Sequence, residues 1–229
     1  MFDSLKAIVD AFPSLLLGTS VTLQLTAFSV SIGTILGTLL ALARLSRYQF
    51  LRCSARFYVD FFRGTPLLVQ IFTIYFGLPA LFQNLSLEFQ LARFSAAIIA
   101  LSLNSSAYLS EIIRGGIQSI EIGQWEASFS LGMGKLQTLR HIIFPQAIRR
   151  MLPPLGNEFI IILKDTSLVA AIGFEELFRR GQLIVANNYR AFEIYITVAL
   201  IYFGLTLLSS RIFTWLEELM NPVKSNKNK

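Results

Sequence analysis

The sequence contains the stretch AFPSLLLGTSVTLQLTAFSVSIGTILGTLLALA at residues 11–43, which is 33 residues without a charged side chain. A helix needs about 20 mostly apolar residues to cross the hydrocarbon core of a bilayer. The glycines Gly18, Gly33 and Gly37 lie inside the stretch, and membrane helices use such small residues for close packing. An acidic residue in the preceding flank and the length of the stretch argue against a cleaved signal peptide. We therefore predict a membrane-spanning helix over about residues 15–43.

The composition of the whole chain is typical of a membrane protein. Of its 229 residues, 54% are hydrophobic and 15% are charged, and the mean hydropathy is +0.58. Soluble domains carry roughly a quarter charged residues. The low charge and the 13% aromatic content argue against intrinsic disorder. A disulfide scaffold is excluded because Cys53 is the only cysteine.

Four further segments are expected to cross the membrane, at about residues 65–86, 94–113, 151–174 and 194–215. The fourth span is the least apolar, and within it the pair Pro153-Pro154 predicts a kink or an interruption. The sequence contains no tandem repeat and no clear inverted repeat. It thus predicts an all-α membrane protein with five transmembrane helices in a single domain, residues 1–229.

The basic residues indicate how the chain is oriented. Of the 20 Lys and Arg residues, 13 fall in one alternating set of loops and five in the other. Because Lys and Arg are enriched in cytoplasmic loops, this split predicts an outside N-terminus and a cytoplasmic C-terminus. Arg179, Arg180 and Arg190, in the last outer loop, fit this orientation least well. The net charge of +6 is thus a topology signal, and we expect no nucleic-acid binding.

The sequence lacks the residues expected of an enzyme or a metal site. It has one histidine, His141, and one cysteine, which cannot form a Cys/His metal cluster. The only Gly-Lys pair, Gly134-Lys135, lacks the spacing of a P-loop. We expect no metal and no enzymatic activity in this chain. If ATP powers the protein, another chain must bind the nucleotide.

The connection between the third and fourth spans, residues 115–150, is long enough to have structure of its own. Its pattern predicts two short helices, at residues 124–131 and 135–144. The second has apolar side chains at helical spacing. Between them, glycines at 132 and 134 predict a sharp corner that exposes Met133. Two interpretations are open, an amphipathic hairpin on the membrane surface and a docking element for a soluble partner.

This connection resembles the EAA loop of bacterial ABC importer permeases. That pattern is Glu-Ala-Ala, three residues, Gly, nine residues and Ile-x-Leu-Pro. This sequence departs from it modestly, at Ser128 and Phe144. The resemblance implies that the loop couples the permease to an ATP-binding subunit, and it favours the docking interpretation. The implied coupling residues are Glu126, Ala127, Gly132, Met133 and Pro145.

Further stretches look like the polar amino-acid permeases of the histidine/glutamine type. They are RGTPLLVQ at residues 63–70, NSSAY at 104–108, EIIRGGI at 111–117, PQA at 145–147 and LGNEF at 155–159. The resemblance implies the MetI-like fold and a permease subunit of an ATP-driven importer for polar, including basic, amino acids. It implies that the transmembrane helices rock between inward-facing and outward-facing states.

The same resemblance implies a set of partners and a cellular location. The partners are two ATP-binding subunits, a second permease that is identical or related, and an extracytoplasmic solute-binding protein. ATP and Mg would bind to the partner ATPase, so this chain needs no cofactor. The implied location is the bacterial inner membrane, where the chain is multi-pass and surrounded by the lipid bilayer.

Polar side chains at membrane depth are the candidate substrate contacts. A charged side chain at the bilayer centre costs about 3 kcal/mol, so Glu158, Lys164 and Asp165 require an explanation. Glu158 is suited to the ammonium group of an amino acid. Asn157 and Lys164 are seven residues apart, as are Glu158 and Asp165, so all four side chains are expected to line one aqueous cavity. The alternative is an ion-pair network that fixes helix packing.

A second polar face lies on the third span. Asn104, Ser105 and Tyr108 are candidate substrate contacts, and hydrogen bonding between helices is the alternative for Asn104 and Ser105. Glu111 is expected to form a helix-end ion pair with Arg114. Three other functions remain open on the residues alone. They are an ion-coupled secondary transporter using Glu158 or Asp165, a membrane-embedded enzyme, and a structural or receptor subunit.

Overall fold

A computed structural model describes residues 2–87 and 89–220, with side chains from residue 6 onward. The polar tail at residues 221–229, predicted to be cytoplasmic, lies outside the described residues. All regular structure in the described ranges is helical. The α-helices are α1 (Phe2–Arg44), α2 (Gln49–Gly64), α3 (Leu67–Phe72), α4 (Leu78–Asn84), α5 (Arg93–Gln118), α6 (Ile122–Ser130), α7 (Lys135–Thr138), α8 (Phe144–Asp165), α9 (Leu177–Asn188) and α10 (Ala191–Met220). Two π-helical turns at Thr73–Gly77 and Leu139–Ile143 and a 3₁₀ helix at Thr166–Ile172 connect some of them.

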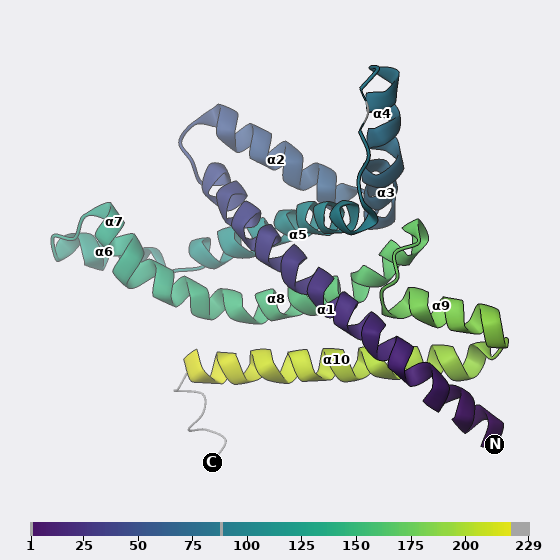
Figure 1. The fold of residues 1–229 in the computed structure, drawn as a ribbon. Helices are drawn as coiled ribbons and strands as arrows, with labels where there is room; N and C mark the ends of the chain where they lie inside the picture. The colour runs from purple at the N-terminus through teal and green to yellow at the C-terminus, as the bar shows by residue number, and fades with distance from the viewer. Residues whose placement is uncertain (1, 88, 221–229) are drawn as a thin grey trace, which may run out of the picture.

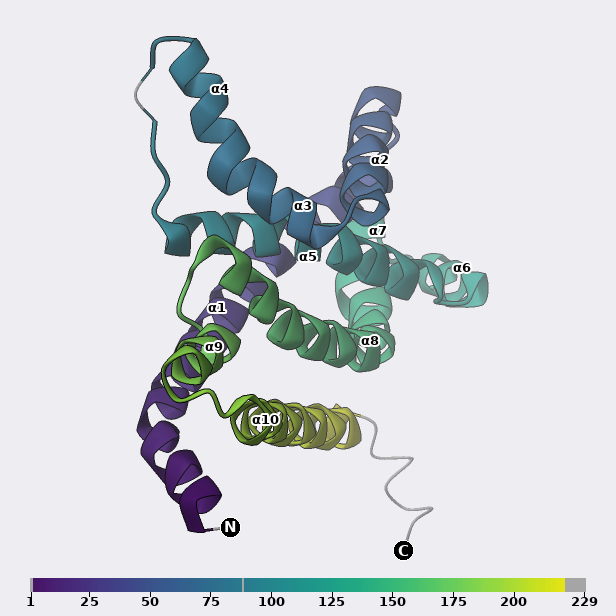
Figure 2. The ribbon, with the colours of Figure 1, turned by 90° about the vertical axis from the view of Figure 1, so that its right-hand side faces the viewer.

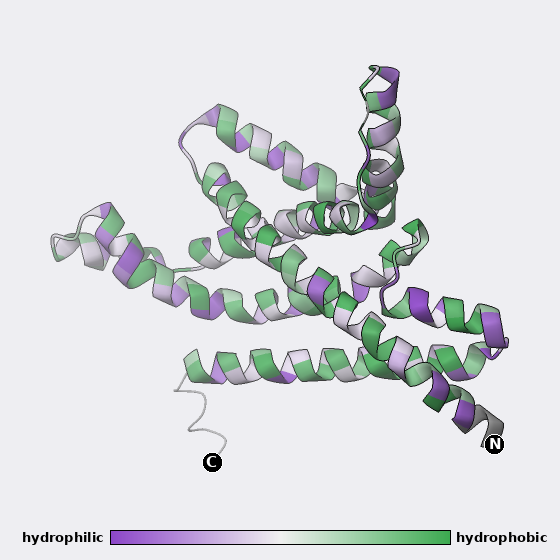
Figure 3. Cartoon of the chain, in the orientation of Figure 1, coloured by the Kyte–Doolittle hydropathy of each residue, from purple (hydrophilic) through white to green (hydrophobic). Residues whose placement is uncertain are grey.

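Four helical segments within the described ranges are long and apolar enough to cross a membrane. They are Lys6–Arg44, Leu67–Asn84, Arg93–Gln118 and Ala191–Met220. Helix α8, which contains most of the expected fourth span, is not among them. It carries five charged residues, at positions 149, 150, 158, 164 and 165. Figure 3 shows the contrast between mostly hydrophobic α10 and α8, where hydrophilic residues are interspersed.

The long helices run between two ends of the molecule. Helices α6 and α7 lie at one end, and α9 and the start of α1 lie at the other (Figure 1). Helix α8 begins beside α7 and runs back past α5 and α10 towards α9. It therefore crosses the same layer as α1, α5 and α10. The proline pair Pro153-Pro154 lies inside α8 without ending it, so of the two predicted effects, a kink or an interruption, the interruption does not occur. The helix continues although two backbone N–H donors are missing.

The prediction that the glycines of the first span serve close packing is confirmed. Helix α1 packs along α5, and a Cβ atom added at Gly37 would lie 3.0 Å from the backbone oxygen of Ser106. At Gly33 it would lie 2.9 Å from Oγ of Ser105. Gly18 approaches α9 in the same way, 2.8 Å from Cα of Leu177. These contacts fix α1 against both α5 and α9.

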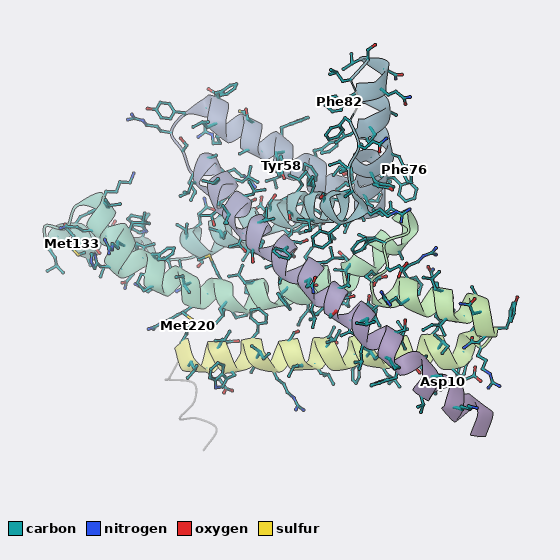
Figure 4. All side chains as sticks on the ribbon, in the orientation of Figure 1. Asp10, Tyr58, Phe76, Phe82, Met133 and Met220 are labelled. Atoms are coloured by element: carbon teal, nitrogen blue, oxygen red, sulfur yellow. The ribbon has the colours of Figure 1, made fainter. Side chains whose placement is uncertain are left out.

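Two helices were not expected from the sequence, and the second span differs from its prediction. Helix α2 lies in a connection between spans that was expected only to be basic, and α9 lies in the connection predicted to be the last outer loop. The uncharged window at residues 65–86 is not one regular helix, because the π-helical turn separates α3 from α4. Figure 2 shows that α4 projects away from the rest of the bundle, whereas α3, at its base, packs against α5 and the 3₁₀ helix. Phe82 lies on α4, and Phe76 lies on the π-helical turn before it (Figure 4).

A buried carboxylate fixes the start of α9. Glu176 caps that helix by accepting hydrogen bonds from the backbone N–H groups of Phe178 (2.9 Å) and Arg179 (2.7 Å). The hydroxyl of Tyr202, on α10, donates a third hydrogen bond at 2.8 Å. Burial raises the pKa of the Glu176 carboxyl, and these hydrogen bonds partly offset the effect. The cap thus ties α9 to α10 without exposing the carboxylate to water.

Candidate functional sites

Glu158 is a buried carboxylate in the middle of α8. Its side chain is 4% exposed, and Oε1 has no hydrogen-bond partner among the described residues. Asp165, seven residues later on the same helix, is half-buried. A buried charge without a partner is costly, and ionisable groups at membrane depth are usually functional. Glu158 is therefore the strongest candidate contact for a cationic group.

The other polar residues of α8 do not gather around Glu158. Asn157 and Lys164 are exposed, whereas Glu158 is buried, because successive residues on a helix point about 100° apart. The expected single cavity lined by all four side chains is therefore not formed within this chain. The alternative of an ion-pair network that fixes helix packing is not formed either, since neither Lys164 nor Asp165 has a salt-bridge partner within 4.0 Å in the described ranges.

The polar face of α5 contacts neighbouring helices. The side-chain amide of Asn104 donates a hydrogen bond to Oε1 of Gln70 at 3.0 Å and a longer one to the Phe62 carbonyl at 3.4 Å. Gln70 in turn donates to the Phe62 carbonyl at 2.9 Å. Ser105 is fully buried against α1, with no hydrogen-bond partner for Oγ. The Asn104 contacts are those of a residue that holds α5 to the junction of α2 and α3.

A cluster of arginines surrounds Glu111, which lies nearer the C-terminal end of α5. Arg114 donates to Oε2 of Glu111 at 2.5 Å, which confirms the predicted helix-end pair. Arg44 of α1 also forms an ion pair with Glu111, and the guanidinium of Arg63 lies 3.9 Å away. The same guanidinium lies over the ring of half-buried Tyr108, 5.2 Å from its centroid.

Arg44 and Arg63 were not identified as site residues from the sequence. Arg63 could have been found, because it lies at the end of a strongly amphipathic stretch and seven residues after Arg56, on the same helix face.

The second candidate site is the corner between α6 and α7. The N–H of Met133 donates to the Ser128 carbonyl at 3.1 Å, and the N–H of Gly132 donates to the Phe129 carbonyl at 2.9 Å. Gly132 has φ +78°. This is the Schellman arrangement that ends a helix with a left-handed residue. The N–H of Gly134 then donates to the Gln137 side chain at 3.0 Å, which starts α7.

The surface of this corner is apolar and exposed. Leu131 is 82% exposed and Leu136 is 77% exposed. Met133 lies at the corner (Figure 4) but is half-buried, so the expectation that it is the exposed residue is wrong. The exposed side chain is instead that of Leu131, at the C-terminal end of α6. Glu126, Ala127 and Pro145 are all exposed.

The corner is joined directly to the buried carboxylate. The backbone stays helical from Lys135 through the π-helical turn to Asp165. Pro145 directly follows the π-helical turn and Phe144, so its missing N–H is accommodated inside a continuous helical segment. A movement imposed on α6 and α7 therefore reaches Glu158 through one helical segment.

A bundle of membrane-length helices with an unpaired buried carboxylate and an exposed apolar corner at one end defines a membrane transport subunit that meets a partner. The chain belongs to the family described as "Binding-protein-dependent transport system inner membrane component", which matches residues 33–222. Members of this family work with an ATPase and a substrate-binding protein, and the permease itself has no enzymatic activity.

Relatives match almost the whole chain. The glutamine transport system permease protein GlnP of Escherichia coli (strain K12) is 42% identical over 94% of this chain and 96% of its own length. The octopine transport system permease protein OccM of Rhizobium radiobacter is 42% identical over 95% of this chain and 90% of its own. These matches support the ATP-driven permease and not the ion-coupled alternative.

Solved structures confirm the fold. The crystal structure of an amino acid ABC transporter with histidines superposes with a TM-score of 0.85 and 42% identity, over 92% of this chain and 96% of that chain. An inward-facing structure of the MetNI methionine ABC transporter gives a TM-score of 0.69 at 19% identity, over 96% of this chain and 99% of that chain. The predicted all-helical MetI-like fold is therefore correct.

Proposed function

We propose that this chain is the membrane-spanning permease subunit of an ATP-driven importer of polar amino acids in the bacterial inner membrane. The observation that carries this proposal is the TM-score of 0.85 with an amino acid ABC transporter over 92% of the chain. The glutamine and octopine permeases support the substrate class. A carboxylate at the site favours a substrate with a cationic group, which every amino acid has.

The proposed topology has five crossings with the N-terminus outside. The fourth crossing is α8 with the following 3₁₀ helix, which is supported by its path between the two ends of the bundle. Two of the three arginines that fitted an outer loop least well have acidic neighbours. Arg180 lies 3.4 Å from Glu175, and Arg190 lies 3.7 Å from Glu193. Because acidic residues contribute little to the orientation, the proposed topology rests on the 13-to-five split of the basic residues.

The α6–α7 corner is the proposed docking site for the ATPase. Two ATPase subunits would bind ATP and Mg and close on each other. Of the coupling residues, Gly132 and Met133 lie at the corner, Glu126 and Ala127 lie on α6, and Pro145 lies at the start of α8. Movement of the corner would pass along α8 and switch the site around Glu158 between inward and outward access. A solute-binding protein would deliver the amino acid at the opposite end.

A second permease, identical or related, would cover α2. That helix exposes Arg52 and Asp60 beside the aromatic side chains of Phe57 and Phe61. Exposed charges on a helix that packs against membrane spans are costly in contact with lipid. They are accommodated where two permeases enclose an aqueous path. The candidate substrate contacts along that path are Glu158, Asp165, Lys164, Asn157 and Tyr108, whereas Asn104 and Ser105 are buried in contacts between helices.

Reconstitution tests this function directly. The chain, its ATPase and its binding protein would be placed in proteoliposomes, and uptake of radiolabelled glutamine, arginine, histidine and lysine would be measured. We expect uptake of at least one of them that requires both ATP and the binding protein. Uptake driven by an ion gradient without the ATPase, or uptake of none of these amino acids, would contradict the proposal.

A further inference from the structure

An open groove lies between the end of α1 and the start of α6. Its volume is about 770 Å³, and its walls come from α1, α5, α6, α7 and the π-helical turn after α7. The apolar part of the wall includes Leu42, Leu45, Ile122 and Trp125. Helix α6 packs mainly against α7 and the π-helical turn, so its side towards α1 is left open. The volume lies within the range of about 300–1,000 Å³ that is typical of small-molecule sites.

The groove continues an exposed apolar stripe on α1. Ile32, Ile35, Leu39 and Leu42 follow one another at intervals of three and four residues, which places them on one face of the helix. All four side chains are exposed, with Ile35 at 64% and Leu39 at 59%. An apolar face of this length on a membrane-length helix is a surface for lipid chains. Because Leu42 also lines the groove, the groove opens directly onto that surface.

The position of Trp125 indicates that the groove lies at the membrane boundary. Its ring is half-buried in the groove wall. Tryptophan is enriched where lipid chains meet the headgroups, because its ring is apolar and its N–H is polar. The other tryptophan, Trp215, lies near the end of α10, on the same side of the molecule as α6 (Figure 1). A lipid with its chains on the α1 stripe would therefore have its headgroup at the groove.

The rim of the groove carries one acid and one base. Glu121 and Lys135 both line it, and both side chains are exposed. Neither has a salt-bridge partner within 4.0 Å among the residues that the structure describes. A zwitterionic aminophospholipid carries a phosphate and a primary ammonium group, so its headgroup is complementary to both residues. An anionic headgroup without an amine would complement Lys135 alone.

We propose that the groove binds one aminophospholipid of the phosphatidylethanolamine type. The lipid ammonium donates to Glu121, and the phosphate accepts from Lys135. One acyl chain lies against Leu42 and Trp125 and continues along the α1 stripe. This site goes beyond the proposed import function, because it needs no transported substrate. The bound lipid would fill the space between α1 and α6 and so support the helix that leads to the docking corner.

Photocrosslinking tests the site in the assembled protein. The permease–ATPase complex would be placed in phosphatidylglycerol nanodiscs that contain a small fraction of phosphatidylethanolamine or phosphatidylcholine, each with the same diazirine in an acyl chain. Trypsin releases the groove peptide, residues 115–135, and a reference peptide on α10, residues 191–211. Labelling of the groove peptide is divided by labelling of the reference, which corrects for lipid incorporation. The ammonium of phosphatidylcholine is methylated, so it cannot donate a hydrogen bond to Glu121.

We expect the labelling ratio of the wild-type complex to be about threefold higher with phosphatidylethanolamine than with phosphatidylcholine, the scale of one exposed charged contact. Glu121→Gln should lower the ratio for phosphatidylethanolamine to that for phosphatidylcholine. Lys135→Gln, read on the longer peptide 115–140, should lower both ratios about threefold, because both lipids carry the phosphate. The matched controls are Glu218→Gln and Arg140→Gln, exposed charges that do not line the groove, and they should leave both ratios near wild type.

Three results would overturn the assignment. Equal ratios for the two headgroups in the wild-type complex would indicate lipid contact without recognition. A headgroup preference that survives both groove variants would show that Glu121 and Lys135 do not bind the headgroup. A labelled reference peptide beside an unlabelled groove peptide would show that another chain, such as the ATPase or the second permease, covers the groove instead of lipid.

Discussion

The packing of α1 on α5 makes a quantitative prediction for the substitution Gly37→Ala. A Cβ atom at this position would lie 2.9 Å from Cβ of Leu109, 3.0 Å from the backbone oxygen of Ser106 and 3.1 Å from the backbone nitrogen of Ser110. Two of these atoms belong to the backbone of α5, so no side-chain rotation removes the clash. The two helices must move apart to accept the methyl group.

Overpacking of this kind typically costs about 1–3 kcal/mol. For a chain of this size, 1 kcal/mol corresponds to about 2–4 °C in the unfolding midpoint. The matched control is Gly204→Ala on α10, where an added Cβ meets nothing within 4 Å. Both substitutions replace glycine by the better helix former, so their difference isolates the clash. We expect Gly37→Ala to unfold about 2–12 °C below Gly204→Ala.

Thermal unfolding in detergent, followed by the loss of monodisperse protein in size-exclusion chromatography, measures this difference. A decrease for Gly37→Ala, with Gly204→Ala at or above wild type, is the expected result. Equal midpoints for the two variants would show that α1 and α5 are not in contact at Gly37 in the membrane protein, and the packing argument would be refuted.

Three further predictions concern the buried carboxylates and the corner. Glu158→Gln should lower amino-acid uptake at least roughly tenfold through loss of a charged contact, with ATPase co-purification intact; unchanged uptake kinetics would remove this residue from the site. Gly132→Ala introduces a side chain at φ +78° and should destabilise the corner by about 1–2 kcal/mol. Less ATPase should therefore co-purify with this variant than with the control Gly123→Ala, where the backbone has no such constraint. Equal recovery of the ATPase with both variants would contradict the docking role. Folding raises the pKa of the Glu176 carboxyl, so the folded state binds a proton at this carboxyl more tightly than the unfolded state does. The stability of the wild-type protein should therefore fall, relative to that of Glu176→Gln, as pH rises above about 4.3. Parallel pH profiles of the unfolding midpoint from pH 4 to 8 would exclude that linkage.

Local patterns predicted the parts of this protein that depend on neighbours in the chain. The uncharged stretch at residues 11–43 predicted α1, because a membrane-spanning helix satisfies its own backbone hydrogen bonds. The glycines beside Met133 predicted the corner for a similar reason, since a left-handed residue at Gly132 ends a helix locally. The exposure of Met133 was predicted wrongly, because the direction of a side chain at a corner depends on how the two helices meet.

The substrate site was predicted less well than the coupling corner. The seven-residue spacing placed Glu158 and Asp165 on the same face of α8, but it did not indicate which face would be buried. Asn157 and Lys164 are exposed because α8 packs against α5 and α10 on other sides. Asn104 donates a hydrogen bond to Gln70, 34 residues earlier in the chain and close to the junction between α2 and α3. The sequence placed the start of a span at residue 65, but helix α2 before it was not expected, so the contact between Gln70 and Asn104 could not be predicted.

The sequence by itself determined that this chain is an all-helical membrane protein with a sharp corner between two short helices, because apolar length, charge placement and glycine spacing act over one helix or one turn. Only the tertiary structure decided that the guanidinium of Arg63 lies over Tyr108 and near Glu111, contacts that join positions 45 and 48 residues apart. The physical reason is that α2, which the sequence did not predict, lies between the first and second spans and packs its last turn against α5. Charge recognition between helices depends on that packing, and no periodicity within one helix specifies it.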